Sequence, residues 1–381
     1  MATLNLAVVA GETSGDLLGA SVLSALRGHY GDLTIRGVGG EALQRHGLSS
    51  EFPIERLSVM GLVDPLKRLP ELLRCRHRLC RQLLADPPDI FLGIDAPEFN
   101  LPLARRLRRA GVTTVHLVSP SVWAWRQGRL PGIRRAVDLV LCLFPFELPI
   151  YQRSGIPVRF VGHPLADEID PQPDRIAARR ALGLPDIGPL LAVLPGSRQT
   201  EVRHHAAVFL AAAERLCQHE PRLGIVVPLA NEACREAFAT PLGGYSHLPV
   251  TLVAGRSRTV MEAADAVLTV AGTASLEAAL MRRPVVVAYR TDKLTWWVLS
   301  SLVRTEYVAL PNLLLGRGLV PEVLQQHMTP DQLANSLAPW LFGGGAAAVL
   351  DAGFTEIREQ LAVGFAQRAA ASLMELLEPG A

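Results

Sequence analysis

The sequence predicts an α/β fold of two doubly wound, Rossmann-like domains that face each other across a cleft. Two observations predict it. First, the apolar run Asn5–Ala10 is followed by the turn Gly11-Glu-Thr-Ser-Gly-Asp16 and a helical pattern. Second, the apolar run Leu190–Leu194 is followed by the turn Pro195-Gly-Ser-Arg198 and a second helical pattern. A strand that ends in a glycine-containing turn and enters a helix is the usual start of such a domain. Because strands and helices alternate after each start, we expect parallel sheets with helices on both faces.

The same patterns predict the elements and the domain boundaries. A proline-rich stretch places a linker at 171–189, between an N-terminal domain of residues 1–170 and a C-terminal domain of residues 190–350, and residues 351–381 predict a helix that returns to the first domain. Tyr307–Leu310 resembles a further strand. The expected strands are 5–10, 34–38, 89–94, 113–118, 138–143, 158–161, 190–194, 224–228, 250–253, 266–270 and 284–288, and the expected helices are 17–27, 69–84, 101–110, 201–217, 274–281, 293–302 and 354–377.

Composition excludes several classes of protein. A chain of 381 residues with 49% hydrophobic residues can bury two or three cores, and its net charge of +2 gives no sign of a nucleic-acid role. No apolar stretch approaches the roughly 18–20 residues of a membrane span, and the N-terminus lacks the basic segment of a signal peptide. The five cysteines form no Cys-x-x-Cys pair, so we expect reduced thiols in the cytosol or at a membrane surface facing it.

The loop after the first strand is acidic and fits neither common nucleotide motif. It lacks the spacing Gly-x-Gly-x-x-Gly and the lysine of a P-loop, which argues against a dinucleotide oxidoreductase or a P-loop NTPase. Glu12 and Asp16, with Ser14 between them, suit the hydroxyl groups of a sugar better than a phosphate. An ordinary capped turn between strand and helix is the alternative interpretation.

A single carboxylate, Asp95, stands at the tip of the third strand in the segment Gly93-Ile-Asp-Ala-Pro97. We expect it to point into the cleft, where it could act as a general base and take a proton from an acceptor hydroxyl. Glu12 is the second predicted catalytic carboxylate, which would position the acceptor or share the role of base. A helix N-cap is the alternative role for this residue.

The loop after the fourth strand contains two of the five tryptophans, in Ser119-Pro-Ser-Val-Trp-Ala-Trp-Arg126. Core packing alone rarely places two indole rings beside hydroxyls and a cation, because buried indole N–H groups need partners. We expect this loop to bind the acceptor or to anchor the site. The residues predicted for this role are Ser121, Trp123, Trp125 and Arg126.

Two loops of the second domain suit a nucleotide diphosphate. A turn that opens a helix directs N–H groups at one point, and Arg198 adds a permanent planar cation. No Asp-x-Asp occurs, so we expect no bound metal and a diphosphate stabilised by Arg198 and helix N-termini. The predicted binding residues are Gly196, Ser197, Arg198, Gly272, Thr273, Ser275, Glu277 and Asn312.

The segment 57–84 combines apolar and basic residues. Leucines at helical spacing share one face, while Arg74, Arg78 and Arg81 share another, and the apolar residues Val59, Met60 and Leu62 precede them. Such a segment is typical of a contact with an anionic membrane surface. The alternative is a crossover helix whose apolar face covers the sheet.

Five segments together resemble the lipid-A-disaccharide synthase family: Ala10–Asp16, Gly93–Pro97, Ser119–Arg126, Leu194–Arg198 and Leu310–Leu313. The resemblance extends over almost the whole chain, and the Ser119–Arg126 motif is its most specific part. It implies an inverting GT-B glycosyltransferase without a cofactor, peripherally bound to the cytoplasmic side of the inner membrane. Its substrates would be UDP-2,3-diacylglucosamine and 2,3-diacylglucosamine 1-phosphate, bound by the C-terminal and the N-terminal domain, and its products lipid A disaccharide 1-phosphate and UDP.

One residue departs from the family pattern, since Glu98 stands where the family has Asp. This conservative change puts in doubt only a catalytic role for residue 98. Two other functions stay open at this point, a UDP-sugar 2-epimerase, which needs no lipid surface, and a nucleotide-dependent membrane scaffold without turnover. A homo-oligomer is also compatible with the sequence.

Overall fold

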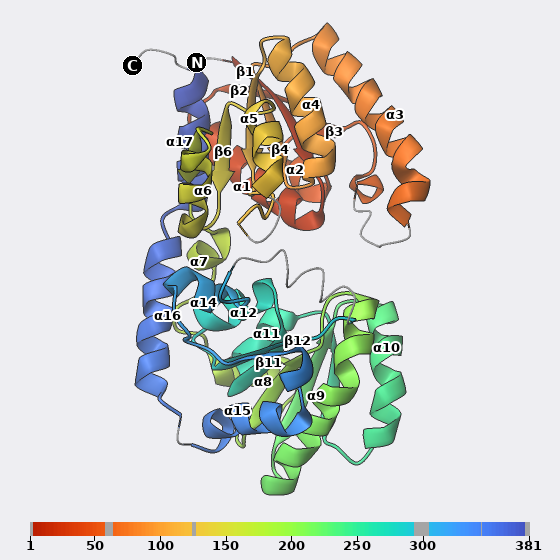
Figure 1. Cartoon of the computed structure of the whole chain (residues 1–381), viewed down its shortest axis with the longest axis vertical. Helices are drawn as coiled ribbons and strands as arrows, with labels where there is room; N and C mark the ends of the chain where they lie inside the picture. The colour runs from red at the N-terminus through yellow and green to blue at the C-terminus, as the bar shows by residue number, and fades with distance from the viewer. Residues whose placement is uncertain (1–2, 58–63, 124–126, 293–304, 344, 378–381) are drawn as a thin grey trace. The chain divides into compact units, whose positions relative to one another are not determined.

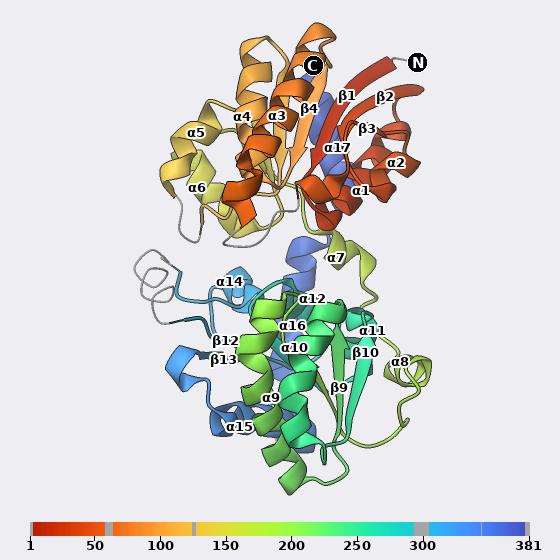
Figure 2. The same ribbon diagram turned by 90° about the vertical axis from the view of Figure 1, so that its right-hand side faces the viewer.

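The computed structural model describes residues 3–57, 64–123, 127–292, 305–343 and 345–377. The chain divides into two compact units, Met1–Asp167 with Gln360–Ala381, and Glu168–Glu359. Each unit contains one parallel sheet with helices on both faces (Figure 1 and Figure 2). The predicted class, two doubly wound α/β domains, is confirmed.

The sheet of the first unit has the strand order β3-β2-β1-β4-β5-β6-β7. Side chains alternate along β1, so that Leu6 and Val8 pack on one side of the sheet and Ala7 and Val9 on the other. Because helices cover both faces, the central strands are apolar throughout, and this made them predictable. The two-residue strand β3 was not predicted. The strands are β1 (Thr3–Ala10), β2 (Asp32–Val38), β3 (Ser49–Ser50), β4 (Ile90–Ile94), β5 (Thr113–Leu117), β6 (Leu139–Cys142) and β7 (Val158–Phe160).

Helices α1 and α17 cover one face of this sheet, and α3 and α4 cover the other. Leu23 of α1 and Leu373 of α17 belong to one buried cluster, whereas Leu83 of α3 and Leu103 of α4 belong to the opposite one. The helices of the first unit are α1 (Thr13–Arg27), α2 (Glu41–Arg45), α3 (Asp64–Ala85), α4 (Pro97–Arg109), α5 (Leu130–Arg134), α6 (Leu148–Arg153), α7 (Pro164–Glu168) and α17 (Phe365–Leu377), with short 3₁₀ turns at Ile54–Arg56, Gln127–Arg129 and Pro145–Glu147.

The C-terminal helix returns to the first unit, as predicted. The carboxylate of Asp167 accepts hydrogen bonds from the backbone N–H groups of Gly364 and Phe365, at 3.1 and 2.7 Å, and so fixes the start of α17. The helix predicted at 354–377 is nevertheless two helices. Gly364 has φ +77°, which a helix cannot contain, and it separates α16 (Ala347–Leu361) from α17.

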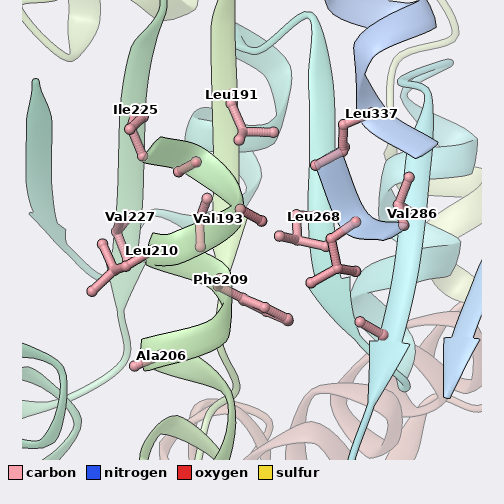
Figure 3. Close-up of a cluster of buried hydrophobic side chains, with 14 of the residues drawn as sticks. Leu191, Val193, Ala206, Phe209, Leu210, Ile225, Val227, Leu268, Val286 and Leu337 are labelled. Carbon is pink, nitrogen blue, oxygen red and sulfur yellow. The ribbon is translucent and has the colours of Figure 1, made fainter. Parts of the chain in front are cut away.

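The sheet of the second unit has the order β10-β9-β8-β11-β12-β13. Figure 3 shows the core on one face, where Leu191 and Val193 of β8 lie with Phe209 and Leu210 of α9. The strands are β8 (Leu190–Leu194), β9 (Gly224–Leu229), β10 (Val250–Ala254), β11 (Ala266–Val270), β12 (Val285–Tyr289) and β13 (Glu322–Leu324); the helices are α8 (Arg175–Ala181), α9 (Gln199–His219), α10 (Glu232–Leu242), α11 (Ser257–Ala263), α12 (Thr273–Leu280), α14 (Leu310–Leu315), α15 (Pro330–Phe342) and α16, with 3₁₀ turns at Gly243–Tyr245 and Gln325–His327.

Of two further predictions for this unit, one is wrong and the other falls outside the described residues. Tyr307–Leu310 is not a strand, because α14 begins at Leu310 and places Pro311 in its first turn, where the missing N–H of proline costs nothing. The strand in this part of the chain is β13, which was not predicted. The helix predicted at 293–302 falls outside the described residues.

The segment 171–189 is a folded part of the second unit, not a linker. It contains α8, whose Arg179 side chain is only 2% exposed. The Arg179 guanidinium donates to the carbonyl oxygens of Ala263 and Gly188, both at 2.9 Å, and to Asp265 at 2.7 Å. Asp265 also accepts from the Leu190 N–H at 2.8 Å, so the segment is tied to the start of β8. Prolines marked the irregular backbone correctly, but they could not reveal these long-range bonds.

Replacing Arg179 should therefore destabilise the second unit. Arg179→Ala leaves Asp265 and several buried carbonyls without their main donor, and we expect a loss of about 3–5 kcal/mol in unfolding free energy. Arg180→Ala is the matched control, because Arg180 pairs with Asp186 on the surface and its replacement should change stability far less. Urea unfolding followed by circular dichroism measures both. Similar shifts for the two variants would contradict this role for Arg179.

Candidate functional site

In the first unit, the two predicted catalytic carboxylates flank the point where strand order reverses. The chain builds outward from β1 through β2 and β3, then returns to add β4 on the other side of β1. Ligands of open parallel sheets bind beyond the carboxyl ends of the strands at this point, where the two loops diverge. Glu12 follows β1 and Asp95 follows β4, so the topology brings both loops to one place.

The backbone at Asp95 is strained and is held by a buried amide. Asp95 and Ala96 have φ of +50° and +41°, in the left-handed region that non-glycine residues rarely adopt. Nδ2 of Asn100 lies within hydrogen-bonding distance of the carbonyl oxygens of Val9, Ile94 and Asp95, at 3.2, 3.2 and 2.8 Å. Asn100 is fully buried and was not predicted. Asn100 joins the ends of β1 and β4. Its amide hydrogen-bonds to the backbone carbonyl of Asp95, not to the carboxylate.

Gly11 allows the two loops to touch. Its N–H donates to the Ile94 carbonyl at 3.3 Å, and a Cβ at this position would lie 2.3 Å from the Cβ of Ala96. Glu12 follows directly in extended conformation as the N-cap of α1, but its side chain makes no capping hydrogen bond. Ser14 lies in the first turn of α1 and is exposed. The prediction that this loop faces a ligand is compatible with that geometry.

Burial raises the pKa of the Asp95 carboxyl. The nearby charge of Glu98 also raises it, while a hydrogen bond from the Ala96 N–H acts in the opposite direction. A carboxylate with a raised pKa holds a proton more tightly, which makes it a stronger base. The alternative role as a helix cap does not fit, since the N-cap of α4 is Ala96. The role of Asp95 as a base stays a prediction.

Asp16 has a structural role that the sequence did not reveal. Its carboxylate is buried and accepts from the backbone N–H groups of Gly40, Ala42 and Leu43, at 2.7, 2.9 and 3.2 Å. Asp16 therefore caps α2 from the neighbouring helix. Because backbone N–H groups surround the Asp16 carboxylate, the expectation that it contacts sugar hydroxyls is wrong. Glu12 is the other acidic residue of this loop.

The tryptophan loop is anchored by aromatic packing and by strained backbone. The Trp123 ring meets the ring of Phe146 edge-on, with centroids 5.2 Å apart, and Phe146 stacks on Phe144 at 5.3 Å. Val118 and Ser121 have φ of +74° and +45°, and the Ser121 side chain is exposed. Trp125 and Arg126 lie outside the described residues. An anchoring role fits Trp123, whereas ligand binding by Ser121 stays a prediction.

A buried polar network holds the other side of this loop. The Ser119 hydroxyl lies 2.8 Å from the Tyr151 hydroxyl and also bonds to the carboxyl of Glu147. All three residues are buried. Burial raises the pKa of Glu147 to about 7, although hydrogen bonds from Ser119 and the backbone act against the shift. No sequence signal marked Glu147, because its partners come from other elements.

In the second unit, strand order reverses between β8 and β11. The loop after β8 contains Gly196, Ser197 and Arg198, but Glu201 occupies its donors. The Glu201 carboxylate accepts from the N–H groups of Ser197 and Arg198, at 3.1 and 3.3 Å, and from the Arg198 guanidinium at 3.0 Å. Gly196 has φ +125°, and a Cβ there would lie 2.5 Å from the Cβ of Glu201. The N–H groups expected to bind diphosphate at Ser197 are thus already used.

The loop after β11 offers a better anion site. Gly272 has φ +154°, a conformation that strains other residues, and it opens α12. The Ser275 hydroxyl and N–H both return to the Gly272 carbonyl, at 2.8 and 3.2 Å, so Ser275 shapes the turn and does not face a ligand. Thr273 is exposed at the helix start. Glu277 is half-buried 3.4 Å from Arg258, and burial raises the pKa of its carboxyl despite that cation.

Asn312 lies beside this region, but its amide is fully used. Its Nδ2 donates to Val320 O and to Glu322 at 2.9 and 2.8 Å, and its Oδ1 accepts from the N–H groups of Leu319 and Val320. The Glu322 carboxylate also receives the N–H groups of residues 308 and 309. Asn312 was predicted to bind the diphosphate, but its amide shapes the loop instead.

Helix α3 fits both interpretations of the basic segment. Leu79 and Leu83 are buried against the sheet, whereas Leu69 and Leu73 are 46% and 44% exposed. The leucines predicted to share one face are thus divided between core and surface. The side chains predicted to meet lipid, Arg74, Arg78 and Arg81, are all exposed. Val59, Met60 and Leu62 lie outside the described residues.

No single described helix is long and apolar enough to cross a membrane. Helix α15 and residues 347–377 meet the criteria of length and composition only as a pair, with a bend of 96° between them. Within the described residues, no three His, Cys, Asp or Glu side chains are placed to hold a metal ion.

Comparison with known proteins places these features in a family. A sequence model of the family described as lipid-A-disaccharide synthetase matches residues 6–370. The lipid-A-disaccharide synthase of Pseudomonas aeruginosa strain LESB58 is 51% identical over 375 residues, covering 98% of each chain. That of Pseudomonas putida strain F1 is 50% identical over 378 residues, covering 99% of this chain and 100% of the relative.

Solved structures share the fold at low identity. UDP-GlcNAc 2-epimerase from Neisseria meningitidis, bound to UDP-GlcNAc, has a TM-score of 0.60 at 13% identity and covers 98% of this chain and 99% of its own. The glycotransferase of kitacinnamycin has a TM-score of 0.62 at 18% identity and covers 99% and 100%. These likenesses support the two-domain fold alone.

The buried Glu147 should make stability depend on pH. Burial raises the pKa of its carboxyl to about 7 in the folded chain, from an ordinary value of 4.5. Between these values the folded chain binds the extra proton, so stability falls as pH rises, by about 3 kcal/mol in total. Glu147→Gln removes this titration. The unfolding free energy of the variant should therefore rise relative to that of the parent, by about 3 kcal/mol between pH 4.5 and 7. Urea unfolding at several pH values in this window measures the difference; parallel profiles would contradict it.

Proposed function

The chain belongs to the lipid-A-disaccharide synthase family, and we propose that its first unit holds the acceptor lipid and the base while its second unit holds the nucleotide sugar. It is a glycosyltransferase of lipid A biosynthesis. The reaction joins the diacylglucosamine of UDP-2,3-diacylglucosamine to 2,3-diacylglucosamine 1-phosphate. The observation that supports this division best is the convergence of Glu12 and Asp95 at the strand reversal of the first unit.

In this scheme, Asp95 is the general base. It takes the proton from the 6-hydroxyl of the acceptor as that oxygen attacks the anomeric carbon of the donor sugar. The bond from this carbon to the diphosphate breaks, UDP leaves with the electron pair, and the configuration inverts. Burial and the raised pKa of Asp95 support the assignment, and Glu12 orients the acceptor hydroxyls from the opposite loop.

The second unit supplies the diphosphate site around the N-terminus of α12. Gly272 and Thr273 present backbone N–H groups at the positive end of a helix. Arg198 adds its guanidinium while Glu201 keeps the loop after β8 in shape. A carboxylate would repel a diphosphate, so Glu277 suits the ribose hydroxyls of the nucleotide instead. The charge of the leaving UDP is then stabilised by protein donors without a metal ion.

Both substrates carry acyl chains, so the enzyme has to work at a lipid surface. We assign this contact to α3, which exposes Leu69 and Leu73 beside Arg74, Arg78 and Arg81. Apolar burial and attraction to anionic headgroups together give reversible peripheral binding. The protein would then reside at the cytoplasmic side of the inner membrane.

Replacing the base should slow turnover without disturbing donor binding. Asp95→Asn keeps the size of the side chain and removes the proton acceptor, so we expect a loss of about 10²–10⁴ in kcat. UDP release with both lipids in detergent micelles measures it, and the dissociation constant of UDP should not change. Glu98→Gln is the matched control, since Glu98 pairs with Arg129 and should stay within a few-fold of the parent. Near-parental turnover of Asp95→Asn would exclude Asp95 as the base.

Replacing Arg198 should affect the transition state more than the bound donor. Negative charge grows on the diphosphate as UDP leaves, so Arg198→Ala should lower kcat by about 10²–10³, and raise the UDP dissociation constant less. Arg203→Ala is the control, because Arg203 is exposed one turn further along α9. Turnover assays and calorimetric titration with UDP separate the two effects. Equal losses in both would indicate ground-state binding alone, and activity lost with EDTA and restored by Mg²⁺ would contradict the metal-free scheme.

A further inference from the structure

A groove lined by arginines lies on the first unit, along the part of α4 that follows the candidate base. It consists of two adjoining cavities of about 580 and 1190 Å³. Both are lined by Arg105 and Arg109 of α4 and by Pro131 and Arg135 of the next helical segment. None of these four residues belongs to the catalytic loops, although Pro97 and Glu98, which follow the candidate base, also line the smaller cavity.

Three arginines that α4 contributes to this groove have no acidic partner. Within the described residues, the side chains of Arg105, Arg106 and Arg109 make no ion pair, and Nε of Arg105 is buried without any hydrogen-bond acceptor. Two other arginines of the lining are paired, since Arg108 contacts Asp138 at 2.7 Å and Arg129 contacts Glu98 at 2.5 Å. The groove therefore contains cations that the protein itself does not neutralise.

This arrangement is unfavourable unless an anion is bound. Arg105 and Arg109 are one helical turn apart, where like charges repel, and Arg106 lies between them in sequence. The negative end of the α4 dipole favours cations in the last turn, but it offers no acceptor to the buried Nε of Arg105. A phosphate group provides both the charge and the several acceptor oxygens that guanidinium groups bind.

The lining also contains hydrocarbon. Leu101, Pro102 and Ile133 contribute to the smaller cavity, and Leu130 and Val137 to the larger one. Cations combined with an apolar lining fit a ligand that carries a phosphate on an apolar body. A free phosphate ion would use only the arginines.

The basic helix α3 packs beside α4, the helix that lines the groove (Figure 1). Arg76 of α3 donates to the Glu98 carbonyl at 3.0 Å, and Arg106 repels it strongly enough to lower its pKa, after the larger effect of burial. Exposed Leu69 and Leu73 lie on the same helix. A membrane that meets α3 thus has a cationic groove on the adjacent helix.

We propose that this groove binds the phosphate headgroup of an anionic glycerophospholipid of the bilayer, as a site separate from the acceptor site. The inference rests on the proposed function in one respect, that the enzyme works at a lipid surface. Arg105, Arg106 and Arg109 bind the phosphate, and the apolar lining receives the glycerol and the upper acyl chain.

The test is binding to phosphatidylcholine vesicles with and without about 30% phosphatidylglycerol, measured by flotation. The triple variant Arg105→Gln, Arg106→Gln, Arg109→Gln should lose affinity for the anionic vesicles on the order of 100-fold. A control triple, Arg45→Gln, Arg222→Gln and Arg235→Gln, removes the same charge from exposed positions elsewhere and should bind like the parent. The double variant Arg106→Gln, Arg109→Gln keeps the half-buried Arg105 and guards against misfolding, and it should show an intermediate loss.

Turnover in detergent micelles separates this proposal from the function. The groove variants should release UDP at the parental rate, with an unchanged KM for the acceptor. A raised acceptor KM with intact vesicle binding would assign the groove to the acceptor phosphate and overturn the proposal. Groove variants that bind vesicles like the control triple would overturn it as well, as would inorganic phosphate that competes with the vesicles at millimolar concentration.

A triple variant of α3, Arg74→Gln, Arg78→Gln and Arg81→Gln, completes the set. If it binds vesicles like the control while the groove variants lose binding, the α3 contact is wrong and the groove stands. Absence of UDP release from the parent would reject the transferase function and leave the vesicle results intact.

Discussion

The order of the parallel strands is the constraint on which both candidate sites depend. Each sheet starts in its middle, with β1 or β8, grows outward on one side and then returns to the other. Main-chain hydrogen bonds between β1 and β4, and between β8 and β11, hold loops from distant parts of the sequence at one edge. The reversal also sends successive helices to opposite faces, so the loops diverge. The topology therefore brings the loops that contain Glu12 and Asp95 to one place.

Local hydrogen bonds then decide which polar side chains remain for chemistry. The carboxylate of Asp16 and the amide of Asn312 look like ligand-binding groups in the sequence, yet backbone groups satisfy them. The carboxylate of Glu201 occupies backbone N–H groups that were expected to bind the diphosphate. Asn100 has the opposite effect at Asp95, because it bonds to the carbonyl of that residue and leaves the carboxylate for other partners. Buried polar groups without partners are costly, so capping and loop closure come before function in assigning their bonds. A polar side chain in a functional loop is therefore a candidate for ligand binding only where hydrogen bonds within the protein do not already satisfy it.

The sequence predicted the layers of the fold better than the bonds between them. Strands buried on both faces, such as β4 and β8, are apolar at every position and stand out from their surroundings. Tyr307–Leu310 has the same composition, but Glu322 accepts the N–H groups of Val308 and Ala309, and a strand cannot form. Arg179 was overlooked within a proline-rich segment, because two of its partners, Ala263 and Asp265, are distant in sequence. The positions of Glu12 and Asp95 followed from topology, whereas Asn100 and Glu147 needed coordinates.

The geometry of α4 limits how the first unit can meet a membrane. The helix begins two residues after Asp95 and rises about 1.5 Å per residue, so its ends at Pro97 and Arg109 are about 18 Å apart. Suppose that the arginines at the C-terminal end of α4 bind headgroups and that the α4 axis is perpendicular to the bilayer. The distance from Asp95 to the lipid phosphates would then be greater than the length of one sugar ring. The acceptor is itself a lipid whose sugar lies at the headgroup level, so its 6-hydroxyl could not reach the base without leaving the surface. An α4 axis along the membrane plane removes the conflict, since the arginines and Asp95 then lie at similar depth. The same orientation lets the neighbouring α3 meet the lipid along its length.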